Sequence, residues 1–280
     1  MITICRTDNI MSISTIIPSY KNPKFLDACI HSCIKGKKNE TTKIIVVVDG
    51  FIGESQHVLN KYEGGIEILD LGQNMGMDKA INYGVWNCES ENIFVVNDDQ
   101  IFSDNWDVDL SELNLEKTVY TIEQIERSHG IFGFTVNNFG DTVDTFNQSK
   151  FDDFVKVNKS DKSTESGRIF PFLMKKKWFM SAGGFEDFKS PFWTDVDFFL
   201  KLELMGLEFR RTYKTMLFHW GSSATKNRVD SEAIKFKSSE GPAAQLFYYK
   251  WGYMPQMGGN NYKNTKYPHS QTEVKGVIFN

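Results

Sequence analysis

The feature that most constrains this chain is a run of five apolar residues, Ile44–Val48, that stops at Asp49-Gly50. Such a run is typical of a strand buried on both faces of a parallel sheet. Other apolar strands alternate along the chain with segments whose apolar residues have helical i, i+3, i+4 spacing. The predicted order is strand Ser12–Pro18, helix Lys24–Ile34, strand Lys43–Val48, helix Gln56–Tyr62, strand Ile66–Leu69, helix Asp78–Cys88 and strand Ile93–Val96. This order predicts an α/β fold with a doubly wound, mostly parallel sheet.

Polar side chains follow the predicted strands at the points where these strands end. The four polar segments are Ser19-Tyr20, Asp49-Gly50, Gln73-Asn74 and Asn97-Asp98-Asp99. In open α/β sheets ligands bind beyond the carboxyl ends of the strands. We therefore expect these segments to converge on one binding site.

The second half of the chain is less regular. The pattern weakens between Ser103 and Ser166, and the polar segment Asn158–Gly167 is expected to be a mobile loop. Order returns in Arg168–Met174 and is followed by a glycine turn at residues 181–185. A helix is predicted for Asp195–Gly206 and a strand for Phe209–Phe218, which leads to His219. From residue 221 onward we expect a helical and irregular extension.

Composition excludes several classes of protein. The formal net charge of −4 and the lack of a long basic run argue against nucleic acid as a partner. The four cysteines form no CxxC pair, which favours reduced thiols in a cytoplasmic protein. No apolar run is long enough to span a bilayer, and the N-terminus lacks a secretory apolar region. We therefore expect a cytoplasmic protein without a transmembrane segment.

Seven segments between Ser12 and Trp220 together resemble the family 2 glycosyltransferases of the GT-A fold. In order they are STIIPSYKN, KIIVVVDG, LGQNMGMDKAINYG, FVVNDDQIF, SAGGFEDF, FWTDVDFFLKLELMG and FHWG. The resemblance implies a Rossmann-like GT-A catalytic domain over residues 1–220, with helices on both faces of the sheet. Its nucleotide-binding half would span about residues 12–102 and its acceptor half about 168–220. Residues 221–280 would form a small C-terminal extension.

The resemblance also implies the reaction. A sugar would move from a nucleotide-diphospho-sugar, with UDP-sugar the expected donor, to a hydroxyl of a glycan, lipid-linked or protein acceptor. Such a transfer needs a cation or basic groups for the leaving diphosphate, a carboxylate beside the acceptor hydroxyl, and groups that orient the base. The sequence does not indicate which sugar is transferred or in what oligomeric state.

A metal site is expected at Asn97-Asp98-Asp99. Family 2 enzymes usually carry Asp-x-Asp there, so Asp99 matches the second aspartate, while Asn97 replaces the first and offers only a neutral carbonyl oxygen. His219 stands where many relatives complete the metal shell. Oxygen and imidazole ligands suit Mn²⁺ or Mg²⁺. Asp98 is expected to face the ribose or the sugar of the donor.

The donor would be held by the other strand ends. In relatives an acid at the position of Asp49 accepts a hydrogen bond from the nucleotide base, and Pro18, Ser19 and Tyr20 are expected beside the same base. Asn74 and Lys79 lie in the segment that approaches the ribose and the diphosphate. An exposed lysine with no ligand is the alternative for Lys79.

Asp195 is the predicted general base of an inverting transfer. It matches an acid of the family's motif, in which Thr194 replaces the preceding acid, and the helix dipole at a first turn favours a carboxylate. Asp197 is expected to be structural. The replacements at Asn97 and Thr194 leave open a catalytically inactive nucleotide-sugar or glycan-binding module. A nucleotidyltransferase is disfavoured because no glycine-rich basic loop follows the first strand.

Overall fold

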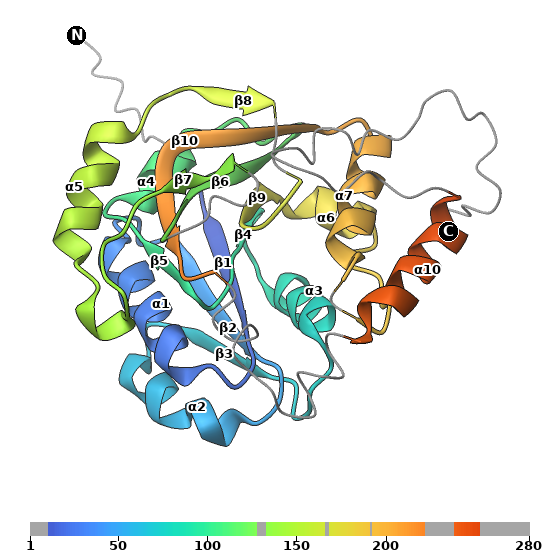
Figure 1. The fold of residues 1–280 in the computed structure, drawn as a ribbon, viewed down its shortest axis with the longest axis horizontal. Coiled ribbons are helices and arrows are strands. Elements are labelled where there is room, and N and C mark those ends of the chain that lie inside the picture. The colour runs from blue at the N-terminus through green and yellow to red at the C-terminus, as the bar shows by residue number, and fades with distance from the viewer. Residues whose placement is uncertain (1–10, 128–132, 166–167, 191, 222–237, 253–280) are drawn as a thin grey trace, which may run out of the picture.

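The computed structural model describes residues 11–127, 133–165, 168–190, 192–221 and 238–252. A central sheet is covered by helices on both faces (Figure 1). The strands are β1 Ile13–Ser19, β2 Lys43–Val48, β3 Glu67–Asp70, β4 Asn92–Val95, β5 Gln100–Phe102, β6 Thr118–Glu126, β7 Thr135–Val136, β8 Ser163–Glu165, β9 Phe172–Lys175 and β10 Glu208–His219. The α-helices are α1 Pro23–Gly36, α2 Ile52–Leu59, α3 Met77–Asn87, α4 Trp106–Ser111, α5 Gln148–Asn158, α6 Lys176–Ser181, α7 Thr194–Leu204 and α10 Glu240–Trp251. Short 3₁₀ helices are η1 Asn60–Tyr62 and η3 Val143–Thr145.

The strand order along the sheet is β3-β2-β1-β4-β9-β6-β10-β5, with β7 beside β6 and β8 beside β10. The first four strands run parallel, as the apolar runs predict. The strand β9 is antiparallel to both of its neighbours, whereas β10 is parallel to β6. The predicted doubly wound, mostly parallel sheet is therefore confirmed.

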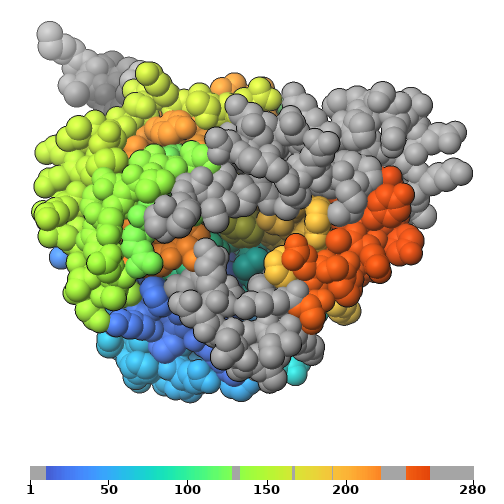
Figure 2. Space-filling view, viewed as in Figure 1, coloured from blue at the N-terminus to red at the C-terminus, as the bar shows by residue number. Residues whose placement is uncertain are grey.

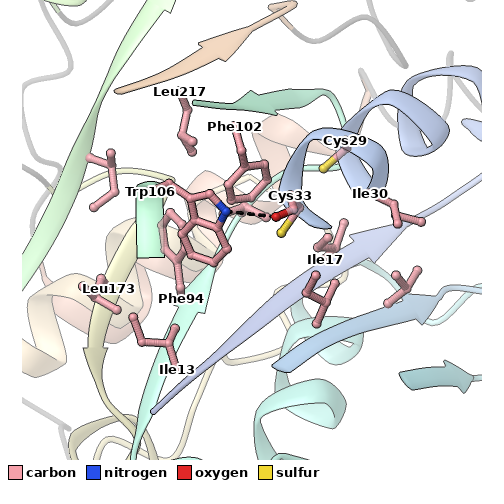
Figure 3. Packing of buried hydrophobic residues seen from close by; sticks show 14 of the residues in the cluster. Ile13, Ile17, Cys29, Ile30, Cys33, Phe94, Phe102, Trp106, Leu173 and Leu217 are labelled. Atoms are coloured by element: carbon pink, nitrogen blue, oxygen red, sulfur yellow. Dashed lines mark hydrogen bonds between the residues drawn. The ribbon is translucent and has the colours of Figure 1, made fainter. Parts of the chain in front are cut away.

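Alternate side chains of the central strands enter separate cores. In β1, Ile17 packs with α1 and α2 on one face, while Ile16 packs with α3 on the other. In β2, Val46 belongs to the first core and Val47 to the second. This burial on both faces explains why Ile44–Val48 of β2 is continuously apolar and why β1 is largely apolar. Figure 3 shows the first core, where the fully buried Trp106 of α4 donates its indole hydrogen bond to the carbonyl of Cys33 at 3.0 Å.

Two segments differ from the sequence-based expectation. The expected loop at residues 158–167 contains the short strand β8, which pairs antiparallel with β10, so the loop interpretation is wrong for residues 163–165. The weak pattern after Ser103 conceals β6, a nine-residue strand in the middle of the sheet, and the helix α5. The polar side chains of β6 do not follow the apolar pattern because they bond to distant parts of the chain.

The expected C-terminal extension is described only for residues 238–252, which contain α10, and the Gly/Asn/Tyr-rich tail segment lies outside the described residues. The helix α10 packs against α7 and the turn that precedes it. The face of the molecule seen in Figure 2 has a hollow near its centre, with β10 and α10 on opposite sides of it. Among the described helices, none is long and apolar enough to cross a membrane.

Candidate active site

Strand pairing brings Asp99 next to His219, although 120 residues separate them in the sequence. Asp99 lies in the turn between β4 and β5, and β5 pairs antiparallel with the end of β10, so that Gln100 faces His219. The backbone N–H of Trp220 donates to the carbonyl of Asp99 at 3.2 Å and fixes this register. As a result the Asp99 Oδ1 atom lies 3.4 Å from the His219 Nε2 atom. The structure thus brings together two of the three residues predicted to hold a metal.

Glu126 lies on the other side of the same imidazole. It ends β6, which runs parallel to β10, and its Oε1 atom lies 3.3 Å from His219 Nδ1. Burial of His219 opposes protonation, but the carboxylates of Asp99 and Glu126 outweigh it and raise the pKa of His219 to about 9. Sequence reasoning missed Glu126, because nothing in the pattern reveals that β6 lies beside β10.

Once the Nε2 proton of His219 is displaced, the side-chain atoms of Asp99 and His219 can hold a divalent cation. A separation of 3.4 Å between the two atoms allows one ion to contact both at about 2.1 Å, the usual distance for a small hard cation. Glu126 is placed as the outer carboxylate that commonly orients a metal-bound histidine. Within the described ranges, no three His, Cys, Asp or Glu side chains form a complete metal-binding cluster.

Asn97 and Asp98 precede the metal candidate in the same turn. The backbone N–H of Asn97 donates to Gln100 Oε1 at 3.1 Å. Asp98 accepts hydrogen bonds from Ser19 Oγ at 2.7 Å and from Asn22 Nδ2 at 3.0 Å. Burial, with the adjacent charge of Asp99, raises the pKa of Asp98 to about 7. Asp98 therefore joins the ends of β1 and β4, while its contact with the donor stays a prediction.

Asp49 holds the neighbouring loop in place. Its carboxylate is buried at the end of β2 and accepts backbone hydrogen bonds from Met75 at 2.6 Å and Gly76 at 3.0 Å. Gly50 follows at φ +79°, where an added Cβ would lie 2.6 Å from the backbone nitrogen of Asn74. Only glycine lets the two loops approach this closely. Asn74 itself is exposed, and its contact with the donor stays a prediction.

An aromatic pair lies beside the ends of β1 and β2. The ring of Tyr20 meets the ring of Phe51 edge-on at 5.9 Å, and Lys21 Nζ lies 3.8 Å from the centre of the Phe51 ring. Phe51 is half exposed and left-handed at φ +59°, which is uncommon for a bulky residue and persists where the surroundings impose it. Pro18 is buried in β1 opposite Val47. Phe51 was missed by sequence reasoning, although an aromatic residue directly after Asp49-Gly50 could have signalled it.

Helix α3 connects the segment around Asn74 and Lys79, which is expected to contact the donor, to the glycine turn at residues 181–185. Lys79 pairs with Asp187 at 2.8 Å, and this contact raises the pKa of the lysine. One turn later, the buried side-chain amide of Asn82 donates to the carbonyl of Phe185 and accepts from its N–H, both at 2.8 Å. The segments expected to contact donor and acceptor are therefore fastened to each other.

Asp195 lies in the first turn of α7, as predicted. Its side chain is partly buried, its Oδ1 atom accepts from the N–H of Val196 at 2.8 Å, and burial raises its pKa to about 6. Asp197 is fully buried and bonds to Trp251 and Lys250 of α10. Asp195 and Asp197 thus lie in different environments, and the role of Asp195 as general base stays a prediction.

The match to a family model, together with the fold, identifies the chain as a glycosyltransferase of the GT-A fold. The chain belongs to the family described as Glycosyl transferase family 2, whose sequence model matches residues 14–176, more than half of the chain. It is 26% identical over 214 residues to an uncharacterized glycosyltransferase of Haemophilus influenzae, covering 70% of this chain and 71% of that protein.

Two solved structures share the fold. The crystal structure of S. aureus TarS 1-349 superposes with a TM-score of 0.52 at 17% identity, over 75% of this chain and 60% of that one. The crystal structure of GalNAc-T7 with UDP, GalNAc and Mn²⁺ gives a TM-score of 0.56 at 14% identity, over 76% of this chain and 44% of that one. The chain therefore spans less than two thirds of the length of these structural relatives.

Proposed function

We propose that this glycosyltransferase moves a sugar from a nucleotide-diphospho-sugar, with UDP-sugar the expected donor, to an acceptor hydroxyl, with inversion and with Mn²⁺ or Mg²⁺. The observation that carries the proposal is the pairing of Asp99 with His219 at 3.4 Å, with Glu126 behind the imidazole. The presence of UDP and Mn²⁺ in the structure of GalNAc-T7 supports the choice of nucleotide and metal.

On the donor side, Ser19, Tyr20 and Asp49 would bind the base, and Asn74 and Lys79 would lie along the ribose and diphosphate. Asp99 and His219 would hold the divalent cation, with Asn97 as a further candidate ligand. When bound, such a cation supplies positive charge to the diphosphate as it leaves. Holding the donor in one orientation beside the acceptor makes the transfer an effectively unimolecular step and lowers its entropic cost.

On the acceptor side, Asp195 would act as the general base. The acceptor oxygen forms a bond to the anomeric carbon, the bond from that carbon to the diphosphate oxygen breaks, and the nucleoside diphosphate leaves with the electron pair. The hydroxyl proton passes to the Asp195 carboxylate. A pKa of about 6 suits this role, because the group is ionised near neutral pH and is still more basic than an ordinary aspartate.

The base assignment is tested by Asp195→Asn, which keeps the size and hydrogen-bonding capacity of the side chain but cannot accept the proton. Turnover should fall by about 10²–10⁴-fold while the affinity for the donor stays near normal. Asp109→Asn is the matched control, because Asp109 also lies in the first turn of a helix but belongs to α4 and pairs with Lys159. Near wild-type turnover in Asp195→Asn, or a product that retains the donor's anomeric configuration by NMR, would refute the assignment.

The metal assignment is tested by calorimetry of UDP binding with and without Mn²⁺. In Asp99→Asn the gain in UDP affinity that Mn²⁺ provides should be lost, because the cation loses a charged ligand. Donor screening with detection of the released nucleotide separates a transferase from a binding module, which binds without turnover. A nucleotidyltransferase would instead release pyrophosphate when it is supplied with a nucleoside triphosphate and a sugar phosphate.

The division of the chain is also a proposal. Residues 1–220 would form the catalytic domain and residues 221–280 an extension to it. The acceptor would be a glycan, a lipid-linked sugar or a protein. The cytoplasmic location expected from the sequence stays a prediction.

A further inference from the structure

The end of helix α10 contacts the first turn of α7 through one buried carboxylate. Asp197 Oδ1 accepts a hydrogen bond from the indole N–H of Trp251 at 2.9 Å and lies 2.6 Å from Lys250 Nζ. Its other oxygen, Oδ2, lies 3.2 Å from Lys201 Nζ. Because Asp197 is fully buried, these groups replace its water shell, and removing one of them leaves the charge poorly compensated.

The same helix also packs on the residue that precedes α7. The ring of Phe247 lies 5.1 Å from the ring of Trp193, which adopts a left-handed conformation at φ +71°. The carbonyl of Trp193 accepts the N–H of Asp197 at 2.9 Å and so opens the helix. A bulky residue in this conformation persists only where its surroundings hold it. Thus α10 supports both ends of the segment that contains Asp195.

The contacts extend to the glycine turn. Lys250 also pairs with Glu186, just after that turn. Lys201 donates from Nζ to the carbonyl of Gly184 at 2.8 Å. The turn, the start of α7 and the end of α10 therefore meet at Asp197. Neither lysine is well exposed, so this is an internal junction of the protein.

We propose that Lys250 and Trp251 are positioning residues that fix the orientation of Asp195 by holding Asp197. The inference rests on the proposed function of Asp195 as general base. Asp195 and Asp197 are two residues apart in one helical turn, so a shift of Asp197 moves the backbone that carries Asp195. Misplacement of a reacting group by about 1 Å can cost about 100-fold in rate. The C-terminal helix is then part of the catalytic unit, although neither residue touches the substrate.

The first test is Trp251→Phe, which keeps a buried aromatic ring and removes the N–H donor together with part of the indole ring. We expect kcat to fall about tenfold or more, with the KM for the donor changed by less than about twofold. The matched control is Trp106→Phe. Trp106 is also fully buried and donates its indole N–H, but it donates to Cys33 in the first core, away from α7 and α10. The control should lose comparable thermal stability and keep its kcat per folded molecule.

The second test covers the case in which Trp251→Phe does not fold. Lys250→Met removes the charge and keeps most of the side chain, and should lower kcat, whereas Lys250→Arg should restore most of it. Lys214→Met is the matched control, because Lys214 is similarly buried and also bridges two carboxylates, those of Glu112 and Asp161. Those carboxylates are exposed and unconnected with α7, so kcat should not change.

The outcomes are distinguishable. If Asp195→Asn loses turnover while Trp251→Phe and Lys250→Met keep the kcat of their controls, the positioning role is wrong and the proposed function stands. If Asp195→Asn keeps its turnover, the assignment of Asp195 as the base is wrong, and the positioning role that rests on it is wrong as well. A selective loss of kcat in both α10 variants, together with loss in Asp195→Asn, supports the inference.

Discussion

Replacing Gly184 with alanine should disrupt the connection between α3 and the glycine turn. Gly184 has φ +70°, and a Cβ there would lie 2.5 Å from Asn82 Oδ1, well inside van der Waals contact. Asn82 is buried and makes both of its 2.8 Å hydrogen bonds to the backbone of Phe185. The new methyl group must therefore push the amide away from its partners.

The expected cost has two parts. Alanine in a left-handed conformation costs about 1–2 kcal/mol. Displacing the Asn82 amide leaves buried backbone groups without partners, at about 1–3 kcal/mol for each group. Gly183 provides the matched control, because it has φ +76° but no atom within 4 Å of its added Cβ. Gly183→Ala should show only the first cost, so Gly184→Ala should be less stable than this control by about 2–6 kcal/mol, the cost for the N–H and the carbonyl of Phe185.

Denaturation in guanidinium chloride measures this difference directly, with the midpoints and slopes compared among wild type and both variants. The double variant Asn82→Ala/Gly184→Ala should be more stable than the sum of the single changes predicts, because the clash is absent when the amide is gone. Equal free energies of unfolding for Gly183→Ala and Gly184→Ala would refute the reasoning.

Two further predictions concern the chemistry. Because Asp195 has its pKa raised to about 6 and must be ionised to act as a base, kcat/KM should rise with pH, level off above about pH 7 and fall to about a tenth at pH 5. Asp78, which is also buried with a pKa of about 6, provides the control: Asp78→Asn should leave this fall in kcat/KM at low pH unchanged. Activity that stays unchanged down to pH 5 would contradict the assignment of Asp195. Asn97→Asp should tighten Mn²⁺ binding in the presence of UDP by adding a charge, and an equal or weaker affinity by calorimetry would exclude Asn97 as a ligand.

The strands that sequence analysis predicted best are those that consist mainly of apolar residues. Helices cover both faces of β1, β2 and β4, so most of the residues in these strands are apolar. The strand β6 (TVYTIEQIE) is just as buried but contains three acidic or amide residues near its end. Gln124 bonds to Gln100 at 2.7 Å, and Glu123 bonds to Thr135 at 2.8 Å. These partners are supplied by the tertiary fold, so local periodicity could not reveal the strand.

The candidate site shows the same limit. The residues at the ends of the parallel strands β1 to β4 could be predicted to lie close together, because the carboxyl ends of parallel strands lie at one edge of the sheet. The neighbourhood of His219 depends instead on β5 and β6, which pair with β10 across long stretches of sequence. His219 itself was found by resemblance, whereas Glu126 had no comparable signal. The contact of Lys250 and Trp251 with Asp197 likewise depends on where α10 docks.

The aspartates at the strand ends differ in what their carboxylates already hold. Asp49 accepts two backbone N–H groups of the next loop, and Asp98 accepts from Ser19 and Asn22. Each therefore fixes the shape of the loops at this edge of the sheet, so removing either should loosen those loops. Asp99 instead faces an imidazole that is itself held from behind. Three acids that follow apolar strands thus have different surroundings, and the partners of each carboxylate come from the tertiary fold.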